Sequence, residues 1–92
     1  MTLTIKGLSK ATFNELLSRL DIIPGNGFIT GKEVYMGDRE EDDITLFTIS
    51  IQHTALNDFS FKLTHTGVVI QRFGMLPSFF LNRDDFEHIF IQ

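Results

Sequence analysis

Alternation of apolar and polar residues constrains the fold of this chain more than any other feature. It is clearest over residues 44–53 and 59–65, where Phe, Ile and Leu recur at every second position among Thr, Ser, Gln and Lys. A period of two predicts strands that bury one face. Residues 2–6, 28–36 and 68–73 have strand-like patterns as well. Strands spaced this closely are typical of an antiparallel meander.

A helix is predicted after the first strand, which Gly7 is expected to end. Ser9 is the expected N-cap, because its hydroxyl can accept a hydrogen bond from a free backbone N–H. Pro24 ends the helix, because the residue before a proline avoids the α region, and Gly31 is expected to mark a bulge in the next strand. The apolar stripe of this helix has the spacing of one helical face and comprises Phe13, Leu16, Leu17 and Leu20.

A second helix is predicted near the end of the sequence. Asn82 is its expected N-cap, and Asp84 and Asp85 follow in its first turn, where negative charge suits the helix dipole. Its expected apolar face comprises Phe86, Ile89 and Phe90.

These elements follow the order β-α-β-β-β-β-α, and residues 78–81 fit either a further short strand or a loop. The sequence therefore predicts a single α+β domain over residues 1–92. We expect a mostly antiparallel sheet of four to six strands with both helices packed on one face. The predicted core comprises Phe13, Leu16, Leu17, Leu20, Phe47, Ile49, Ile51, Phe59, Phe61, Leu63, Phe86, Ile89 and Phe90.

Composition narrows the classes of function. The 8 Lys and Arg against 12 Asp and Glu give a formal charge of −4, which argues against general binding to nucleic-acid backbone or to a membrane surface. Disulfides and cysteine-ligated metal sites are excluded, since the sequence has no cysteine. It has no apolar stretch long enough to span a membrane and no signal-peptide pattern, so a cytoplasmic location is predicted.

One segment, residues 38–43, is strongly acidic. Its five carboxylates and one arginine sum to −4, the charge of the whole chain. A solvated loop that favours solubility is one interpretation. The other is a docking loop for a basic surface, because a cationic partner relieves the repulsion between clustered carboxylates and steers the encounter. The candidate binding residues are Asp38, Glu40, Glu41, Asp42 and Asp43.

The same segment resembles the start of a calcium loop only in part. Asp38, Glu40 and Asp42 alternate like the first ligands, but Asp43 stands where a glycine is needed and Ile49 where a glutamate is needed. We therefore predict that the segment holds no metal.

Three histidines invite a zinc or catalytic interpretation, although none has the spacing that puts two ligands on one helical face. The three are His53, His65 and His88. His53 and His65 could meet if their strands pair, since both lie on the inward-facing phase near strand ends. We favour a structural role for them and predict no cofactor and no bound metal.

The resulting hypothesis is a small acidic, non-enzymatic protein-binding module. Its partner would be a larger host protein or ribonucleoprotein complex with a basic surface. Short acidic domains of this format occur among phage and mobile-element inhibitors of the anti-CRISPR and anti-restriction type, which suggests an inhibitor. Two alternatives stay open at this point. One is a small enzyme or metal-dependent domain that uses the histidines and the acidic segment, and the other is a structural subunit of a homodimer.

Overall fold

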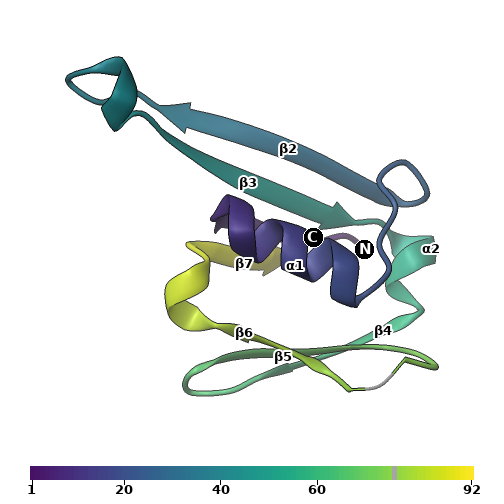
Figure 1. The fold of residues 1–92 in the computed structure, drawn as a ribbon. Helices are drawn as coiled ribbons and strands as arrows, with labels where there is room; N and C mark the ends of the chain where they lie inside the picture. Colours follow the sequence, from purple (N-terminus) through teal and green to yellow (C-terminus); the bar gives the residue numbers. More distant parts are fainter. Residues whose placement is uncertain (76) are drawn as a thin grey trace.

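Seven strands form two antiparallel sheets in the computed structural model, which describes residues 1–75 and 77–92 (Figure 1). The four-stranded sheet has the order β2-β3-β1-β7 and the three-stranded sheet the order β4-β5-β6. The α+β class and the antiparallel pairing are thus confirmed. The larger sheet contains β1 (Leu3–Leu8), β2 (Phe28–Tyr35), β3 (Ile44–Ile51) and β7 (His88–Ile91). The smaller contains β4 (Phe59–Leu63), β5 (Gly67–Arg72) and β6 (Phe79–Asn82).

The helix α1 (Lys10–Arg19) forms as the apolar stripe predicts. Ser9 caps it, since its side chain accepts a hydrogen bond from the Thr12 backbone N–H. In the view of Figure 1, α1 lies between the two sheets, and Phe13 and Leu16 are buried there. A short helix that was not predicted, α2 (His53–Leu56), follows β3 and leads into β4.

The second predicted helix does not form. Asn82 does act as a cap, because its side chain accepts a hydrogen bond from the Asp84 N–H, but only the 3-10 turn η2 (Arg83–Asp85) follows. The chain then enters β7, which pairs with β1. Ile89 and Ile91 in this strand are β-branched and fit a pleated sheet better than an isolated helical turn. The expectation of two helices on one face depended on this helix and is not confirmed.

The bulge of the larger sheet lies at Gly7, not at Gly31. The pairing of β2 with β3 runs without a shift from Phe28 opposite Ile51 to Tyr35 opposite Ile44, with Gly31 opposite Thr48. The register of β1 against β3 shifts between Ile5 and Leu8. Gly7 lies within this shift with a φ of 81°, a conformation that favours glycine.

One cluster of buried side chains joins both sheets to α1. The predicted register of β4 is confirmed, because Phe59 and Phe61 pack against the core while Ser60 and Lys62 are exposed. Leu63 was predicted to be buried, but it is 71% exposed at the end of β4. The other predicted core residues are buried or pack against the cluster, except Phe90, which pairs with Thr4 on the opposite face of the sheet from Ile89.

Candidate functional site

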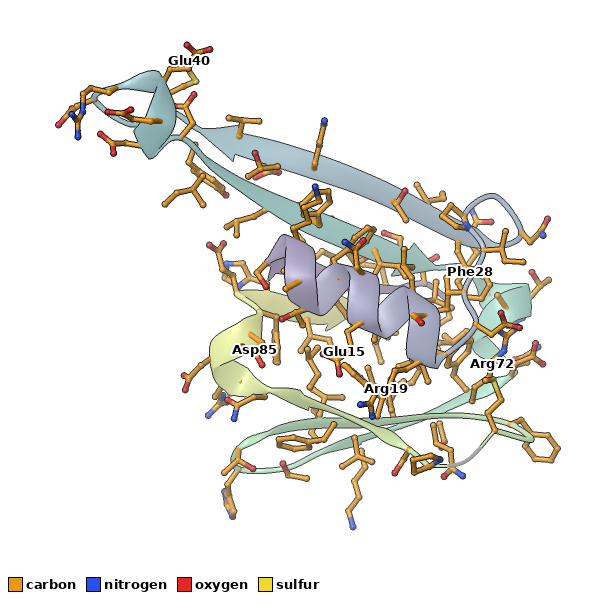
Figure 2. All side chains as sticks on the ribbon, in the orientation of Figure 1. Glu15, Arg19, Phe28, Glu40, Arg72 and Asp85 are labelled. Carbon is orange, nitrogen blue, oxygen red and sulfur yellow. The ribbon has the colours of Figure 1, made fainter. Side chains whose placement is uncertain are left out.

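The acidic segment lies at the end of the β2–β3 hairpin, as predicted from its position between two strands. Figure 1 shows the end of this hairpin projecting beyond α1 and the smaller sheet, and Figure 2 shows Glu40 at this end. A 3-10 turn, η1 (Glu40–Asp42), closes the hairpin. We call residues 38–43 the acidic tip. It includes the five candidate residues Asp38, Glu40, Glu41, Asp42 and Asp43.

Hydrogen bonds and ion pairs inside the acidic tip involve only some of its carboxylates. Arg39 lies 3.0 Å from a Glu41 oxygen and 3.2 Å from an Asp42 oxygen. Asp43 accepts a hydrogen bond of 2.8 Å from the Gly37 N–H. Within the described part of the chain, Asp38 and Glu40 have no cation within 4.0 Å. Two carboxylates of the tip are therefore free to meet an external cation.

Nearly all residues in the half of the hairpin next to the acidic tip are exposed, and we call residues 33–46 the distal arm. The arm extends beyond α1 because the strands of the hairpin are longer than this helix. The helix α1 has ten residues and is about 15 Å long, whereas β2 has eight residues and spans about 26 Å. The radius of gyration, 13.6 Å, exceeds the value of about 12 Å expected for a compact domain of this length.

Exposed apolar side chains flank the acidic tip on this arm. Met36 is 80% exposed, and Val34 and Ile44 are each more than half exposed. Val34 is on the core-facing side of the sheet, in phase with Phe28, whereas Ile44 is on the outer side. Sequence analysis missed these residues, because it placed them in the predicted strands 28–36 and 44–53 without assigning them to the core or to an exposed surface.

The histidines do not converge with each other or with the acidic tip. His53 begins α2, His65 lies in the turn after β4 and His88 begins β7, and all three are exposed. The strand that precedes His53 pairs with β1 and β2, not with β4. Among residues 1–75 and 77–92, no three His, Asp or Glu side chains are grouped so that they could hold a metal ion.

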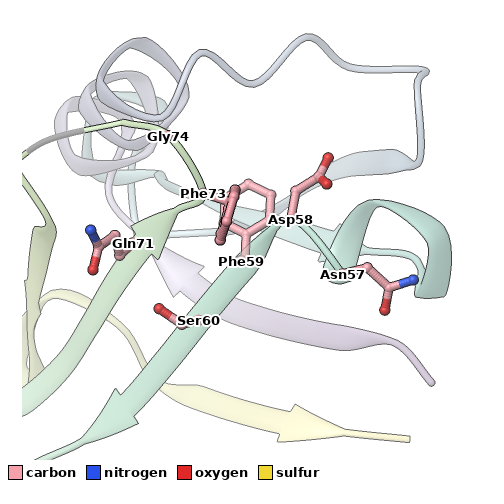
Figure 3. Close-up of a pocket in the computed structure, with 7 residues that line it drawn as sticks. All are labelled: Asn57, Asp58, Phe59, Ser60, Gln71, Phe73 and Gly74. Carbon is pink, nitrogen blue, oxygen red and sulfur yellow. The ribbon is translucent and has the colours of Figure 1, made fainter.

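A cavity of about 400 Å³ lies at one end of the β4–β5 pair (Figure 3). Phe59 and Phe73 contribute aromatic walls, and Asp58 supplies one carboxylate. The backbone closes one side of it through a hydrogen bond of 2.6 Å from the Phe73 N–H to the Asp58 carbonyl oxygen. None of the candidate site residues lines this cavity, and Asp58 is the one ionisable side chain among the described residues of its lining.

No family model, curated protein or solved structure matches this chain. None of the helices in the described residues has the length and apolar character needed to cross a membrane.

Proposed function

We propose that the protein is a small non-enzymatic protein-binding module whose distal arm docks on a basic surface of a larger protein or ribonucleoprotein complex. One observation carries the proposal: free carboxylates and exposed apolar side chains lie together on an arm that extends beyond the core. Met36 and Ile44 flank a tip in which Asp38 and Glu40 have no cation within 4.0 Å in the described chain.

The two kinds of side chain have different physical roles in docking. Exposed carboxylates steer a basic surface toward the arm and mainly raise the association rate. Apolar side chains that leave water on binding slow the dissociation, because their transfer from water is favourable. A loop with a purely solubilising role would need the charges but not the exposed Met36.

We further propose that the basic surface is one that nucleic acid would otherwise occupy. A tip with a net charge of −4 over six residues competes with phosphate for the same lysines and arginines. Docking would then make the protein an inhibitor of a nucleic-acid-binding complex. The proposal keeps the cytoplasmic location that the sequence predicts.

The test compares two charge-neutralised variants by affinity capture from host lysate, followed by binding kinetics with the purified partner. Asp38→Asn with Glu40→Gln removes the two free carboxylates of the tip. Asp84→Asn with Asp85→Asn removes two exposed carboxylates on the turn η2 and serves as the control. We expect the tip variant to bind more slowly at low salt, and the control to bind as the parent does.

A third variant tests whether an apolar side chain contributes to docking in addition to the charges. Met36→Ser keeps the charge of the tip and is expected to raise the dissociation rate of the same partner. The proposal is wrong if the captured partner binds the tip variant, the Met36 variant and the parent with equal rates. Release of the partner by an added nucleic acid would support the inhibitor role, and unchanged binding in its presence would oppose it.

A second candidate, the subunit of a homodimer, is favoured by a groove that none of the distal-arm residues lines. The edge strands β7 and β4 flank an apolar groove of about 350 Å³. Leu63 and Ile91 lie on the core-facing phase of these strands, but they are 71% and 57% exposed. The core is therefore uncovered at this edge. Antiparallel pairing of β7 with itself would satisfy two-fold symmetry and cover it.

Sedimentation over a range of protein concentrations tests this second candidate. Ile91→Lys places a charge in the groove, and Ile29→Lys places the same charge on an exposed apolar position of β2. A homodimer predicts that the parent and the Ile29 variant associate while the Ile91 variant stays monomeric. A parent that is monomeric at every concentration would exclude it.

A further inference from the structure

Outside the acidic tip, titratable side chains gather in one small pocket on the outer face of the larger sheet. The pocket has a volume of about 180 Å³, roughly six times the share of one water molecule in the liquid. A space of this size holds one side-chain head group. It lies where β2, β3 and β1 meet the start of β7, and we call it the outer-face pocket. Its polar lining comprises Lys6, Glu33, Tyr35, Thr48, Glu87 and His88.

The bulge at Gly7 places Glu87 at this pocket. The Glu87 N–H donates a hydrogen bond of 2.8 Å to the Lys6 carbonyl oxygen. A Cβ on residue 7 would lie only 2.6 Å from the Glu87 Cβ, so the close approach depends on glycine. Gly7, which the sequence predicts as the end of the first strand, therefore brings the Glu87 carboxylate toward the Glu33 carboxylate of β2.

Tyr35 and Glu33 form the β2 side of the pocket. The Tyr35 hydroxyl donates a hydrogen bond of 3.0 Å to the Glu33 carboxylate. This hydrogen bond raises the pKa of Tyr35, and the negative charges of Glu33 and Glu87 raise it further. The potential at the phenol is thus negative, although Lys6 also lines the pocket. In the described chain, neither Glu33 nor Glu87 has a cation within 4.0 Å.

We propose that the outer-face pocket binds the guanidinium group of an arginine side chain that the docking partner presents. A guanidinium carries a fork of N–H donors that matches a carboxylate, and its flat face stacks on an aromatic ring. Glu33 and Glu87 supply the carboxylates, and Tyr35 supplies the ring. The inference rests on the proposed function. It specifies that the basic surface of the partner presents an arginine to this pocket, next to the surface that meets the acidic tip.

Other ligand classes fit this pocket less well. The two carboxylates repel an anion such as a phosphate group. A divalent metal would need at least three convergent ligands, and the described residues offer no such group. The ammonium group of lysine has the right charge but lacks the planar fork and the stacking face, so it is the competing ligand that the experiment must separate from arginine.

The test uses N-acetyl-arginine amide as the probe and follows backbone amide signals by NMR. N-acetyl-citrulline amide has nearly the same shape without the charge, and N-acetyl-lysine amide has the charge without the fork. We expect the arginine probe to shift signals around Glu33, Tyr35 and Glu87, and to bind several times more tightly than the other two. Equal binding of the lysine probe would overturn the guanidinium assignment.

Substitutions in the pocket and in the tip distinguish this inference from the proposed function. Glu33→Gln and Glu87→Gln are each expected to weaken the arginine probe about fivefold. The tip variant Asp38→Asn with Glu40→Gln should leave this probe within about twofold of the parent, because neither residue lines the pocket and exposed charges are screened at physiological salt. If both pocket variants bind the arginine probe as the parent does, the arginine site in the outer-face pocket is refuted. The proposed docking role of the acidic tip is not affected by that result. The docking role of the tip is decided separately, by the kinetics of the captured partner.

Discussion

The rings of Phe13 and Phe47 stack with their centroids 4.8 Å apart and 19° between their planes. This contact joins the beginning of α1 to the middle of β3. Further toward the acidic tip, Val34 and Thr45 on the same sheet face are exposed. The stack therefore marks the boundary between the packed part of the hairpin and the distal arm.

Phe47→Ala should loosen the distal arm more than the rest of the fold. Phe47 is half-buried, so its removal is expected to lower the free energy of unfolding by about 2 kcal/mol, below the range for a fully buried Phe. Hydrogen exchange should accelerate most at the paired amides of residues 33–35 and 44–46. The matched variant Leu46→Ala, on the outer face, should cost less. Equal acceleration in β5 and β6 would show that the stack does not hold the arm in particular.

Arg72 ties β5 to the end of α1, and its removal should be costly. Its guanidinium donates hydrogen bonds to the carbonyl oxygens of Leu20, at 2.7 Å, and Asp21, and it lies within 6 Å of the Phe28 and Phe59 ring centroids. Arg72→Met should lower the free energy of unfolding by about 2 kcal/mol, because it removes charged hydrogen bonds and cation–π contacts.

Urea unfolding of the Arg72 variant needs a control of the same chemistry. Arg83→Met removes an exposed arginine of the turn η2 and should change the stability by less than about 0.5 kcal/mol. Arg72→Lys should fall between the parent and Arg72→Met, since it keeps the charge but not the planar fork. A lysine variant as stable as the parent would contradict the role of the two carbonyl contacts.

Gly7 and Gly31 should respond in opposite ways to alanine. Gly7 has a positive φ, and an added Cβ would lie 2.8 Å from the Glu87 backbone nitrogen, so Gly7→Ala should cost more than about 1 kcal/mol. Gly31 has no atom within 4 Å of an added Cβ and no positive φ. Gly31→Ala should therefore be neutral or slightly stabilising. Thermal melting of the two variants compares them directly.

The sequence predicted the elements whose signals are local. The cap at Ser9, the stripe of α1 and the alternation in β3 and β4 each depend on side chains a few residues apart, and all of these elements form. The last predicted helix failed because a long-range partner decided the outcome: β1 offers an open edge, and residues 88–91 pair with it. A cap at Asn82 could not outweigh that pairing.

The candidate site was only partly predictable for the same reason. The charge pattern located the acidic tip, because a charge run between two strands must lie in their connection. The uncovered apolar residues Val34, Met36 and Ile44 depend on how far α1 reaches along the hairpin. The outer-face pocket depends on the bulge at Gly7, which brings Glu87 close to Lys6. Neither relationship can be predicted from residues that are close together in the sequence.

Titration of Tyr35 tests the negative potential of the outer-face pocket. The pKa of Tyr35 should lie above the ordinary value of about 10, because the neutral phenol donates to Glu33 and tyrosinate would be repelled by Glu33 and Glu87. Glu33→Gln should lower the pKa toward the ordinary value, since it removes both the charged acceptor and one negative charge. The chain has one Tyr and no Trp, so tyrosinate absorbance reports this residue alone. A parent pKa at or below 10 would contradict the geometry.

The acidic tip should contribute little to stability, whatever its role in binding. Changing Glu40 and Glu41 to Gln and Asp42 and Asp43 to Asn removes exposed ion pairs to Arg39 and also removes repulsion among the carboxylates. We expect the free energy of unfolding to stay within about 1 kcal/mol of the parent.

Asp43 accepts a hydrogen bond from the Gly37 N–H, so substitutions at this residue can test the charge and the structure of the tip separately. Asn at this position keeps a side-chain oxygen that can accept it, whereas Asp43→Ala removes the acceptor. Exchange of the Gly37 amide should therefore stay slow in Asp43→Asn and become faster in Asp43→Ala, with melting temperatures close to that of the parent in both. If the asparagine variant exchanged as fast as the alanine variant, the charge of Asp43 would be needed to keep the tip folded. Neutralised tips would then lose their docking geometry along with their charge.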